Sequence, residues 1–409
     1  MKRFITTIFS IILVLSLVSC GNIDNFDGDT PLPDGEKIVS PIYNDKNNSS
    51  EASSQIKVPV DPIKTEISFV GVGDNIIYFG NVRDAKSKHI EGGREYNFLP
   101  SYSSVASLIK EADIAFINQE TVMTGDAPTY YPLFNSPQDL AYDLIDVGFD
   151  IINMSNNHML DKGGDGLKAT MDFWNTLDVT TIGGYYNKAD FDNVKVYEEK
   201  GIKIALLSFT EQTNGNALRA DSELYIPYLT ESNVRSQVAL AKEAADFIIV
   251  SVHWGDENTF KPNDYQKKYA NLFAELGVDV ILGHHPHVIQ PVEWLEGANG
   301  HKTLCVYSLG NFMAEQEFDF NMIGGMISFN IVKNNENEPV AEDPVFIPTM
   351  FHFPKSFYDN HIYLLEDYTA DLAAEHGVRT AYGRSMSYER LYKYVKDTIS
   401  AEFLPEYFK

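Results

Sequence analysis

Histidines are crowded into one short stretch of this chain, Gly283-His284-His285-Pro286-His287. The stretch follows the apolar run at residues 278–282, which is typical of a buried strand. Imidazoles just past the carboxyl end of a strand are badly placed for a hydrophobic core and well placed to bind a metal ion. The spacing of His285 and His287 points both rings to one side of an extended segment, as chelation requires. His284 points the other way and is expected either to support the metal ligands from behind or to be structural.

A second motif, Asn156-Asn157-His158, follows the apolar run at residues 151–154. Asn157 offers an amide oxygen to a metal ion, and His158 can donate a proton to a leaving group. Asp161 could accept the other ring N–H of His158 and so fix its tautomer. The alternative interpretation is an Asn-rich turn in which Asp161 caps a helix.

Three more predicted strand ends carry polar residues: Gly73-Asp74, Asn118-Gln119-Glu120 and His253-Trp254-Gly255. Each alone has an ordinary explanation, which is a turn for Asp74, a solvated carboxylate for Glu120 and a core histidine for His253. In α/β sheets, however, ligands collect at the carboxyl ends of strands. Five such ends with ligand-type residues exceed what chance would place there.

The residue types decide which metals fit. Aspartate, glutamate, asparagine and histidine without sulfur suit Zn²⁺, Mn²⁺ or Fe and suit Ca²⁺ poorly. Zinc–thiolate chemistry is excluded because the only cysteines are Cys20 and Cys305. The reaction class indicated is metal-assisted hydrolysis, in which a divalent ion polarises a phosphoryl or acyl oxygen and lowers the pKa of bound water.

The elements that must position these residues alternate between strand and helix, which predicts an α/β fold with a parallel sheet and covering helices. After Asn311 the pattern changes to strands followed by a helical tail. Strands are expected at 67–72, 114–117, 151–154, 179–182, 202–209, 247–252, 278–282 and 325–332. Helices are expected at 101–110, from the Ser136-Pro137 cap signal to Gly148, and at 164–177, 231–245, 264–276 and 387–401.

Composition limits the partners. The chain has 409 residues, of which 44% are hydrophobic, as in a well-buried globular protein. Its net charge of −26 argues against nucleic acid, whose binding needs clustered Lys and Arg. The same charge argues against broad electrostatic capture of an anionic polymer, which would need a local basic patch or a metal ion.

The first residues have the pattern of a targeting segment. Lys2 and Arg3 precede an apolar stretch at residues 4–15 that is too short for a typical membrane span. The following Leu17-Val18-Ser19-Cys20 resembles a bacterial lipobox. We therefore predict a lipoprotein signal peptide at 1–19, lipidation of Cys20, and a flexible tether at 20–65. The protein would be lipid-anchored to the cytoplasmic membrane on its extracytoplasmic face; the alternative is an ordinary secretory signal with an incidental cysteine.

These motifs, in this order, closely resemble the CapA family of bacterial poly-γ-glutamate capsule biosynthesis proteins, which is related to calcineurin-like metallophosphoesterases. The resemblance covers about residues 66 to 315. It implies a metallophosphoesterase-like α/β sandwich of two β-sheets flanked by helices, with a domain at 66–330 that the strands and helical tail of 331–409 complete. The matching pieces are Gly73-Asp74, Asn118-Gln119-Glu120, Ser155 to His158 with Asp161 and Gly163, His253 to Glu257, Gly283 to Pro291, and Tyr307 to Phe312.

The resemblance also implies roles for single residues. His158 would be the catalytic histidine, with Asp161 orienting it. Metallophosphoesterases carry a histidine two residues after the first metal-binding aspartate, where this chain has Ile76. One of the two metal sites therefore lacks a ligand, and Gln119 replaces the family's usual leucine. The implied metal ligands are Asp74, Glu120, Asn157, His253, His285 and His287, and the implied substrate contacts are Asn118, Trp254 and Glu257.

Two functional hypotheses follow. In the first, the protein serves synthesis or export of poly-γ-glutamate capsule or another envelope polymer, carries a metal-dependent hydrolase site, and works beside polyglutamate synthase and export subunits. In the second, it is a non-catalytic scaffold or binding subunit whose metal site is idle. His158 and Asp161 favour the first hypothesis, whereas Ile76 and the acidic composition favour the second.

Overall fold

The computed structural model describes residues 64–335 and 337–409. The predicted signal peptide, Cys20 and nearly all of the predicted tether lie outside the described residues, so these assignments stay predictions. Within the described range, no helix combines the length and the apolar character needed to cross a membrane.

The first sheet begins the fold and contains eight strands among the described residues, in the order β14-β13-β12-β1-β2-β3-β4, with β11 also paired to β1. The four strands β1 to β4 run parallel, whereas β12, β13 and β14 pair antiparallel. The bounds are β1 (Lys64–Asn75), β2 (Ile114–Gln119), β3 (Ile151–Asn153), β4 (Thr180–Ile182), β11 (Asn311–Met313), β12 (Ile323–Asn334), β13 (Val340–His352) and β14 (His361–Leu364).

The second sheet contains six strands within the described part of the chain, in the order β5-β6-β7-β8-β10-β9. Its central strands β6, β7, β8 and β10 are parallel, and the two edge strands are antiparallel. The bounds are β5 (Lys195–Glu199), β6 (Ile202–Thr210), β7 (Phe247–His253), β8 (Val280–His284), β9 (Val292–Glu296) and β10 (Lys302–Val306).

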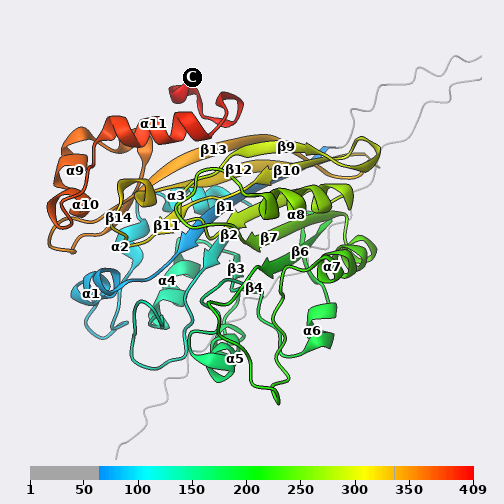
Figure 1. Ribbon diagram of the computed structural model, residues 1–409, viewed down its shortest axis with the longest axis horizontal. Coiled ribbons are helices and arrows are strands. Elements are labelled where there is room, and N and C mark those ends of the chain that lie inside the picture. The colour runs from blue at the N-terminus through cyan, green and yellow to red at the C-terminus, as the bar shows by residue number, and fades with distance from the viewer. Residues whose placement is uncertain (1–63, 336) are drawn as a thin grey trace, which may run out of the picture. The chain divides into compact units, whose positions relative to one another are not determined.

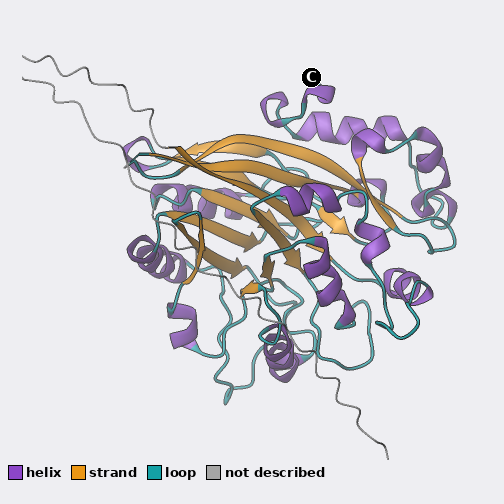
Figure 2. Cartoon of the chain, turned by 180° about the vertical axis from the view of Figure 1, so that it is seen from behind, coloured by secondary structure: helices purple, strands orange, loops and turns teal. Residues whose placement is uncertain are grey.

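Helices lie on the outer faces of the two sheets, as Figures 1 and 2 show from opposite sides. Helices α7 and α8 cover the second sheet, and α4 and α11 contribute to the core of the first. The bounds are α1 (Phe79–Ser87), α2 (Leu99–Tyr102), α3 (Ala106–Glu111), α4 (Asp139–Val147), α5 (Gly163–Trp174), α6 (Lys188–Asp192), α7 (Glu231–Ala244), α8 (Asp264–Glu275), α9 (Ala370–Glu375), α10 (Gly377–Thr380) and α11 (Tyr388–Thr398).

Strand alternation explains how one sequence fills two cores. In β6, Ile204 and Leu206 join the core that also contains the first sheet, whereas Leu207 and Phe209 face α7 and α8. Successive side chains of a strand point to opposite faces, so a strand covered on both sides must be apolar throughout. The apolar runs that precede the polar motifs are such strands.

The predicted fold class, a sandwich of two sheets flanked by helices, is confirmed. Two local predictions were wrong. The helix expected at 101–110 is split in two: α2 ends at Tyr102, and α3 begins at Ala106 after the intervening residues 103–105. Ser136 does not cap α4, because its hydroxyl lies 2.6 Å from that of Thr121 and the helix begins at Asp139 after Gln138.

Candidate metal centre

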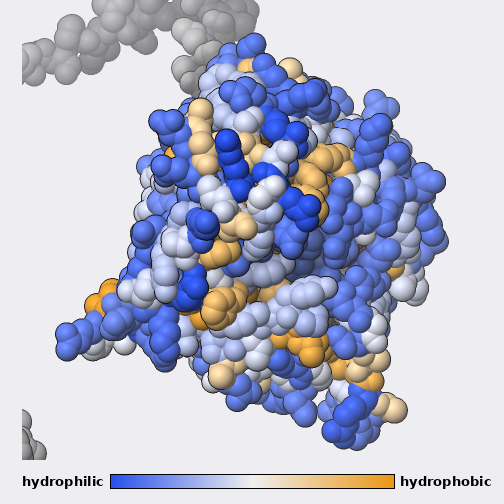
Figure 3. Space-filling view, turned by 60° about the vertical axis from the view of Figure 1, so that its left-hand side comes forward, coloured by the Kyte–Doolittle hydropathy of each residue, from blue (hydrophilic) through white to orange (hydrophobic). Residues whose placement is uncertain are grey.

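The parallel strands of both sheets end on the same side of the molecule, the left side in Figure 1. Figure 3 shows this side, where hydrophobic and hydrophilic residues are mixed around a central hollow. Each sheet contributes three residues to what we call the metal centre. The first sheet contributes Asp74 from β1, Glu120 after β2 and Asn157 after β3, and the second contributes His253 from β7 with His285 and His287 after β8.

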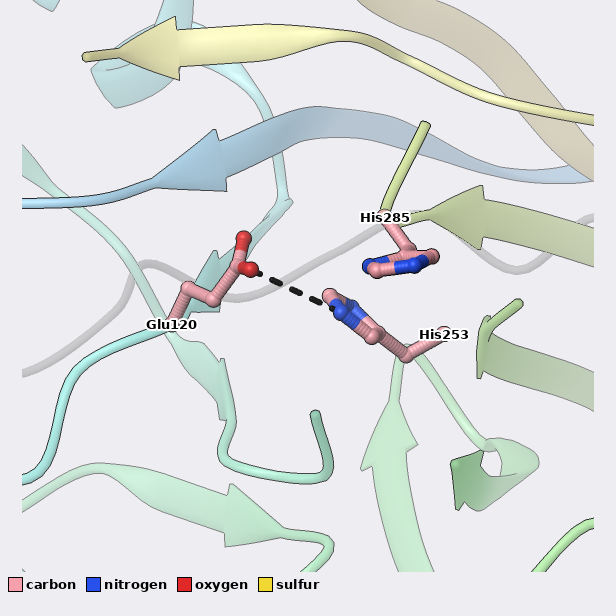
Figure 4. Close-up of side chains that lie close together, drawn as sticks. All are labelled: Glu120, His253 and His285. Carbon is pink, nitrogen blue, oxygen red and sulfur yellow. Dashed lines mark ion pairs between the residues drawn. The ribbon is translucent and has the colours of Figure 1, made fainter. Parts of the chain in front are cut away.

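Glu120, His253 and His285 converge in the metal centre, as Figure 4 shows. The Glu120 carboxylate is completely buried, and neither of its oxygens has a hydrogen-bond partner among the described residues. Nε2 of His253 lies 3.5 Å from Oε1 of Glu120 and 3.1 Å from Oδ1 of Asn157. A buried carboxylate without a partner is costly, so this arrangement indicates a cation.

Asp74, Glu120 and His287 form a second group of close donor atoms. Nδ1 of His287 lies 3.2 Å from Oδ2 of Asp74 and 3.1 Å from Oδ1 of Asn311. Because two acceptors face Nδ1, that nitrogen carries the proton in the neutral ring, whose lone pair is then on Nε2, 3.8 Å from Oε1 of Glu120. This tautomer offers the lone pair to a metal ion.

Burial and mutual charge set the protonation of the centre. Burial, helped by the charge of Asp74, raises the pKa of Glu120 well above its usual range. Burial and the neighbouring imidazoles hold the pKa of His253 well below its ordinary value, and burial lowers that of His285 to about 3. Both histidines are therefore neutral at pH 7, which is the form that binds metal ions.

Asp74 and His287 behave in the opposite way. Burial opposes ionisation of Asp74, but hydrogen bonds and charges from His284 and His287 outweigh it and hold its pKa well below the usual range. Burial likewise opposes the charged form of His287, yet the contact with Asp74 raises its pKa overall. Asp74 also accepts hydrogen bonds from Nδ2 of Asn118, at 2.8 Å, and from the backbone N–H of His285, at 3.1 Å.

The His-Pro-His turn differs from its prediction. An extended segment was expected to point both rings to one side, but the strand β8 ends at His284. His285 has φ 95° and His287 has φ 56°, so both lie in the left-handed region that residues other than glycine rarely adopt. The rings are gathered by this strained backbone, and strain of this kind often accompanies functional sites.

His158 lies beside the metal centre and contacts Asp161 as expected. Nδ1 of His158 is 2.8 Å from Oδ2 of Asp161, which also accepts the backbone N–H of Phe134 at 2.8 Å. The Phe134 ring meets the imidazole edge-on with 4.8 Å between ring centroids. These contacts fix the orientation of His158, while its catalytic role stays a prediction.

The three predicted substrate contacts have different surroundings. Trp254 is completely buried in the second core, and its indole N–H donates to the carbonyl of Tyr307, so it has a packing role instead. Asn118 is also completely buried and orients Asp74. Only Glu257 is exposed, and its carboxylate lies close to donor atoms of His285 and His287.

Sequence reasoning missed several polar neighbours of the centre. Tyr78 lies near enough to Glu120 and Glu257 for their charges to reinforce the rise in its pKa that burial causes. Asn214 approaches both Asn157 and His158, with distances of 3.3 Å to Nδ2 of Asn157 and 3.4 Å to Nδ1 of His158. Neither residue lies directly at a strand end, so the pattern of strand ends gives no sign of them.

The donors present fit a divalent transition metal. Imidazole, carboxylate and amide oxygen meet in a buried space, and Glu120 has no hydrogen-bond partner among the residues described. These donors suit Mn²⁺, Zn²⁺ and Fe.

The fold and site together define an α/β sandwich with a candidate metal centre at the strand ends. The chain belongs to the family described as bacterial capsule synthesis protein PGA_cap, which matches residues 68–316. The resemblance to CapA proteins inferred from the motifs is thereby confirmed.

Named relatives agree with this family. The chain is 32% identical over 201 residues to the PGA biosynthesis protein CapA of Bacillus subtilis (strain 168), a match that covers 47% of this chain and 49% of the relative. It is 28% identical over 289 residues to the capsule biosynthesis protein CapA of Bacillus anthracis, which covers 67% of each chain. The first match thus spans about half the length of that relative.

Among solved structures, the NAD nucleotidase (NadN) of Haemophilus influenzae is similar with a TM-score of 0.43 and 11% identity, covering 84% of this chain and 65% of that one.

Proposed function

We propose that this protein is a membrane-anchored, metal-dependent hydrolase that serves synthesis or export of poly-γ-glutamate capsule or another envelope polymer. The observation that carries the proposal is Glu120, a buried carboxylate without a hydrogen-bond partner among the described residues, which faces His253. The ring of His253 in turn contacts Asn157, the chain neighbour of the oriented His158. Relatives named for capsule and PGA biosynthesis support the biological setting. Partnership with polymer synthase and export subunits is part of the proposal.

The residues divide the work between holding an ion and moving a proton. Glu120, Asn157, His253 and His285 would hold one divalent ion, whose chemistry when bound is to polarise a phosphoryl or acyl oxygen and to activate water. Asp161 binds Nδ1 of His158, which leaves Nε2 as the atom that gives a proton to the leaving group. Phe134 packs edge-on against this imidazole and helps to fix its orientation.

A second ion would be held more weakly by Asp74, Glu120 and His287. Ile76, two residues after Asp74, stands where metallophosphoesterases carry a histidine, and its buried apolar side chain cannot ligate. Elemental analysis of the purified protein should therefore give nearer one than two transition-metal ions per chain. Two tightly held ions, or none under metal-replete conditions, would count against this assignment.

Hydrolysis is tested directly with the metal-loaded protein. We expect turnover of a phosphoester such as bis-p-nitrophenyl phosphate, or cleavage of poly-γ-glutamate, that EDTA abolishes and added Mn²⁺ or Zn²⁺ restores. If neither substrate class is cleaved at a rate above that of metal ions alone, the hydrolase proposal fails.

The second candidate, a non-catalytic scaffold, is favoured by one observation, the apolar Ile76 two residues after Asp74. The two candidates differ in their need for His158. Cells that depend on this protein for polymer production should lose that production with His158→Ala if the protein is a hydrolase. Unchanged polymer production in such cells would support the scaffold, even with metal bound.

Membrane anchoring is part of the proposal and rests on Cys20. Two or more acyl chains anchor a protein stably, whereas one binds only marginally. Cys20→Ser should move the protein from the membrane fraction to the soluble or secreted fraction. A variant that stays in the membrane fraction like the wild type would contradict the lipobox assignment.

A further inference from the structure

The loop between β7 and α8 carries Glu257 across the His-Pro-His turn. Two backbone hydrogen bonds fix the register of loop and turn. The N–H of Trp254 donates to the carbonyl of His284 at 3.1 Å, and the N–H of Asn258 donates to the carbonyl of Pro286 at 2.8 Å. Glu257 therefore precedes a residue that is bonded to the centre of the turn, between His285 and His287.

Side chains from other elements also hold this loop. The amide of Gln290 donates to the carbonyl of Thr259 at 2.6 Å, and Gln266 of α8 donates to Gln290 at 2.8 Å. Gly255 has φ 93°, and an added Cβ there would lie 2.5 Å from Cδ of Gln266. The backbone around Glu257 is thus built into the fold, which keeps a donor near the site at little cost in entropy.

Glu257 completes a donor set that shares residues with both groups already described. One ligand atom each from Glu257, His285 and His287 lie within 4.8 Å of one another. His285 is 7% exposed, and its Nδ1 has no hydrogen-bond partner in the described chain. The Glu257 carboxylate likewise takes part in no hydrogen bond or ion pair with the other described residues.

The charges around these imidazoles also favour a bound cation. Three carboxylates, those of Asp74, Glu120 and Glu257, approach the same imidazoles. No lysine or arginine within the described residues forms an ion pair with any of them. Repulsion between close carboxylates in a poorly solvated site is relieved by a bound cation.

We propose that Glu257 is a metal ligand, which binds the second, more weakly held divalent ion together with His287, while His285 stays with the first ion. Glu257 is exposed whereas the other carboxylates are buried, so it is the ligand that solvent and substrate reach first. The chemical class is a divalent transition metal with mixed carboxylate and imidazole ligands. The inference rests on the metal centre of the proposed function and does not depend on hydrolysis.

The test is a titration of metal-free full-length protein with Co²⁺, followed by calorimetry and by visible absorption of the bound ion. Wild type should bind a first Co²⁺ tightly and a second more weakly. Glu257→Gln should weaken the second binding event by at least about tenfold and leave the first unchanged. Asp256→Asn is the matched control, because it removes the same charge at the neighbouring residue. The Asp256 carboxylate accepts a hydrogen bond from Nδ2 of Asn263 at 2.9 Å, so this variant should titrate like wild type.

The outcomes separate this inference from the proposed function. If Glu257→Gln titrates like wild type, or if wild type saturates at one Co²⁺, the role of Glu257 is wrong and a one-metal hydrolase still stands. If wild type binds no Co²⁺, the metal centre and the proposed function fail together. Because Glu257 is exposed, the variant should unfold at the wild-type temperature in its metal-free form, which thermal unfolding checks.

Discussion

Buried histidines occur in two regions of this molecule, and their partners differ. Besides the metal centre there is a C-terminal histidine pair, His352 at the end of β13 and His376 before α10, with ring centroids 4.9 Å apart. Nδ1 of His352 bonds to the hydroxyl of Tyr368 at 2.8 Å. His376 bonds to the carbonyl of Phe351 through Nε2 and accepts the N–H of Val378 through Nδ1, each at 3.0 Å.

The metal centre has the same residue type at similar burial, but several of its polar atoms lack a hydrogen-bond partner within the described residues. His285 keeps an unpaired buried nitrogen, and Glu120 keeps two unpaired oxygens, among the residues that the structure describes. Burial lowers the pKa of histidines in both regions, to about 3 for both His285 and His376. Burial and a low pKa therefore do not distinguish a ligand from a structural histidine, whereas unpaired lone pairs beside carboxylates do.

The largest expected effect that separates the regions is loss of metal. His285→Ala removes a donor shared by two groups, so bound metal and any metal-dependent hydrolysis should disappear together. The loss of affinity should exceed the roughly 10–100-fold that removal of an outer partner costs. Elemental analysis after gel filtration measures it, with His376→Ala as the control that keeps its metal. If His285→Ala keeps the wild-type metal content, His285 is not a metal ligand and the distinction between the two histidine regions fails.

A second effect separates proton transfer from metal binding inside the site. His158→Ala should lower turnover by about 10²–10⁴-fold, the usual contribution of general acid catalysis. Its metal content should stay unchanged, because His158 belongs to none of the donor groups found among the described residues. Steady-state rates and elemental analysis on the same sample test both statements, and a variant that loses its metal would contradict the division of roles.

A smaller effect belongs to the C-terminal histidine pair. His376→Ala leaves the carbonyl of Phe351 and the N–H of Val378 without their present partner. Buried groups left in this way should lower the free energy of unfolding by about 2–3 kcal/mol. Urea unfolding measures it, with the exposed His89→Ala as control. Equal stability of the two variants would show that these hydrogen bonds are not structural.

The smallest effect is a dependence of stability on pH. The folded-state pKa values of His352 and His376 are lowered by burial to about 4 and about 3, from an ordinary value of 6.5. Below pH 6.5 the unfolded chain takes up protons that the folded chain does not, so stability is lost as the pH falls toward these values. His376→Ala should reduce the slope of unfolding free energy between about pH 6 and about pH 4.5 by up to about 1.4 kcal/mol per pH unit. An unchanged slope would contradict the low pKa assigned to His376. The metal-centre histidines are the same in wild type and in His376→Ala, so their contribution to the difference in slope cancels.

Much of the centre could be predicted because apolar runs reveal strands, and parallel strands end on one side of a sheet. The strand ends alone place Asp74, Glu120 and His253 on that side, and the predicted family and fold class are confirmed. The metal and catalytic roles of these residues stay predictions.

Other features depend on contacts that spacing does not record. The left-handed backbone of His285 and His287 arises from the turn after β8 and not from strand alternation. The burial of Trp254 depends on Tyr307, which lies 53 residues away along the chain. The nearness of Glu257 to the turn depends on the hydrogen bond from Asn258 to Pro286.

The division of the metal centre between the two sheets has a consequence for assembly. Its carboxylates Asp74 and Glu120 come from the first sheet, whereas its imidazoles His253, His285 and His287 come from the second. Neither sheet alone presents a complete set of donors, so the site does not exist in a half-folded chain. An ion held there would bind ligands from both sheets and so stabilise the packing of one sheet on the other. Metal binding would therefore report that both sheets have folded and packed together.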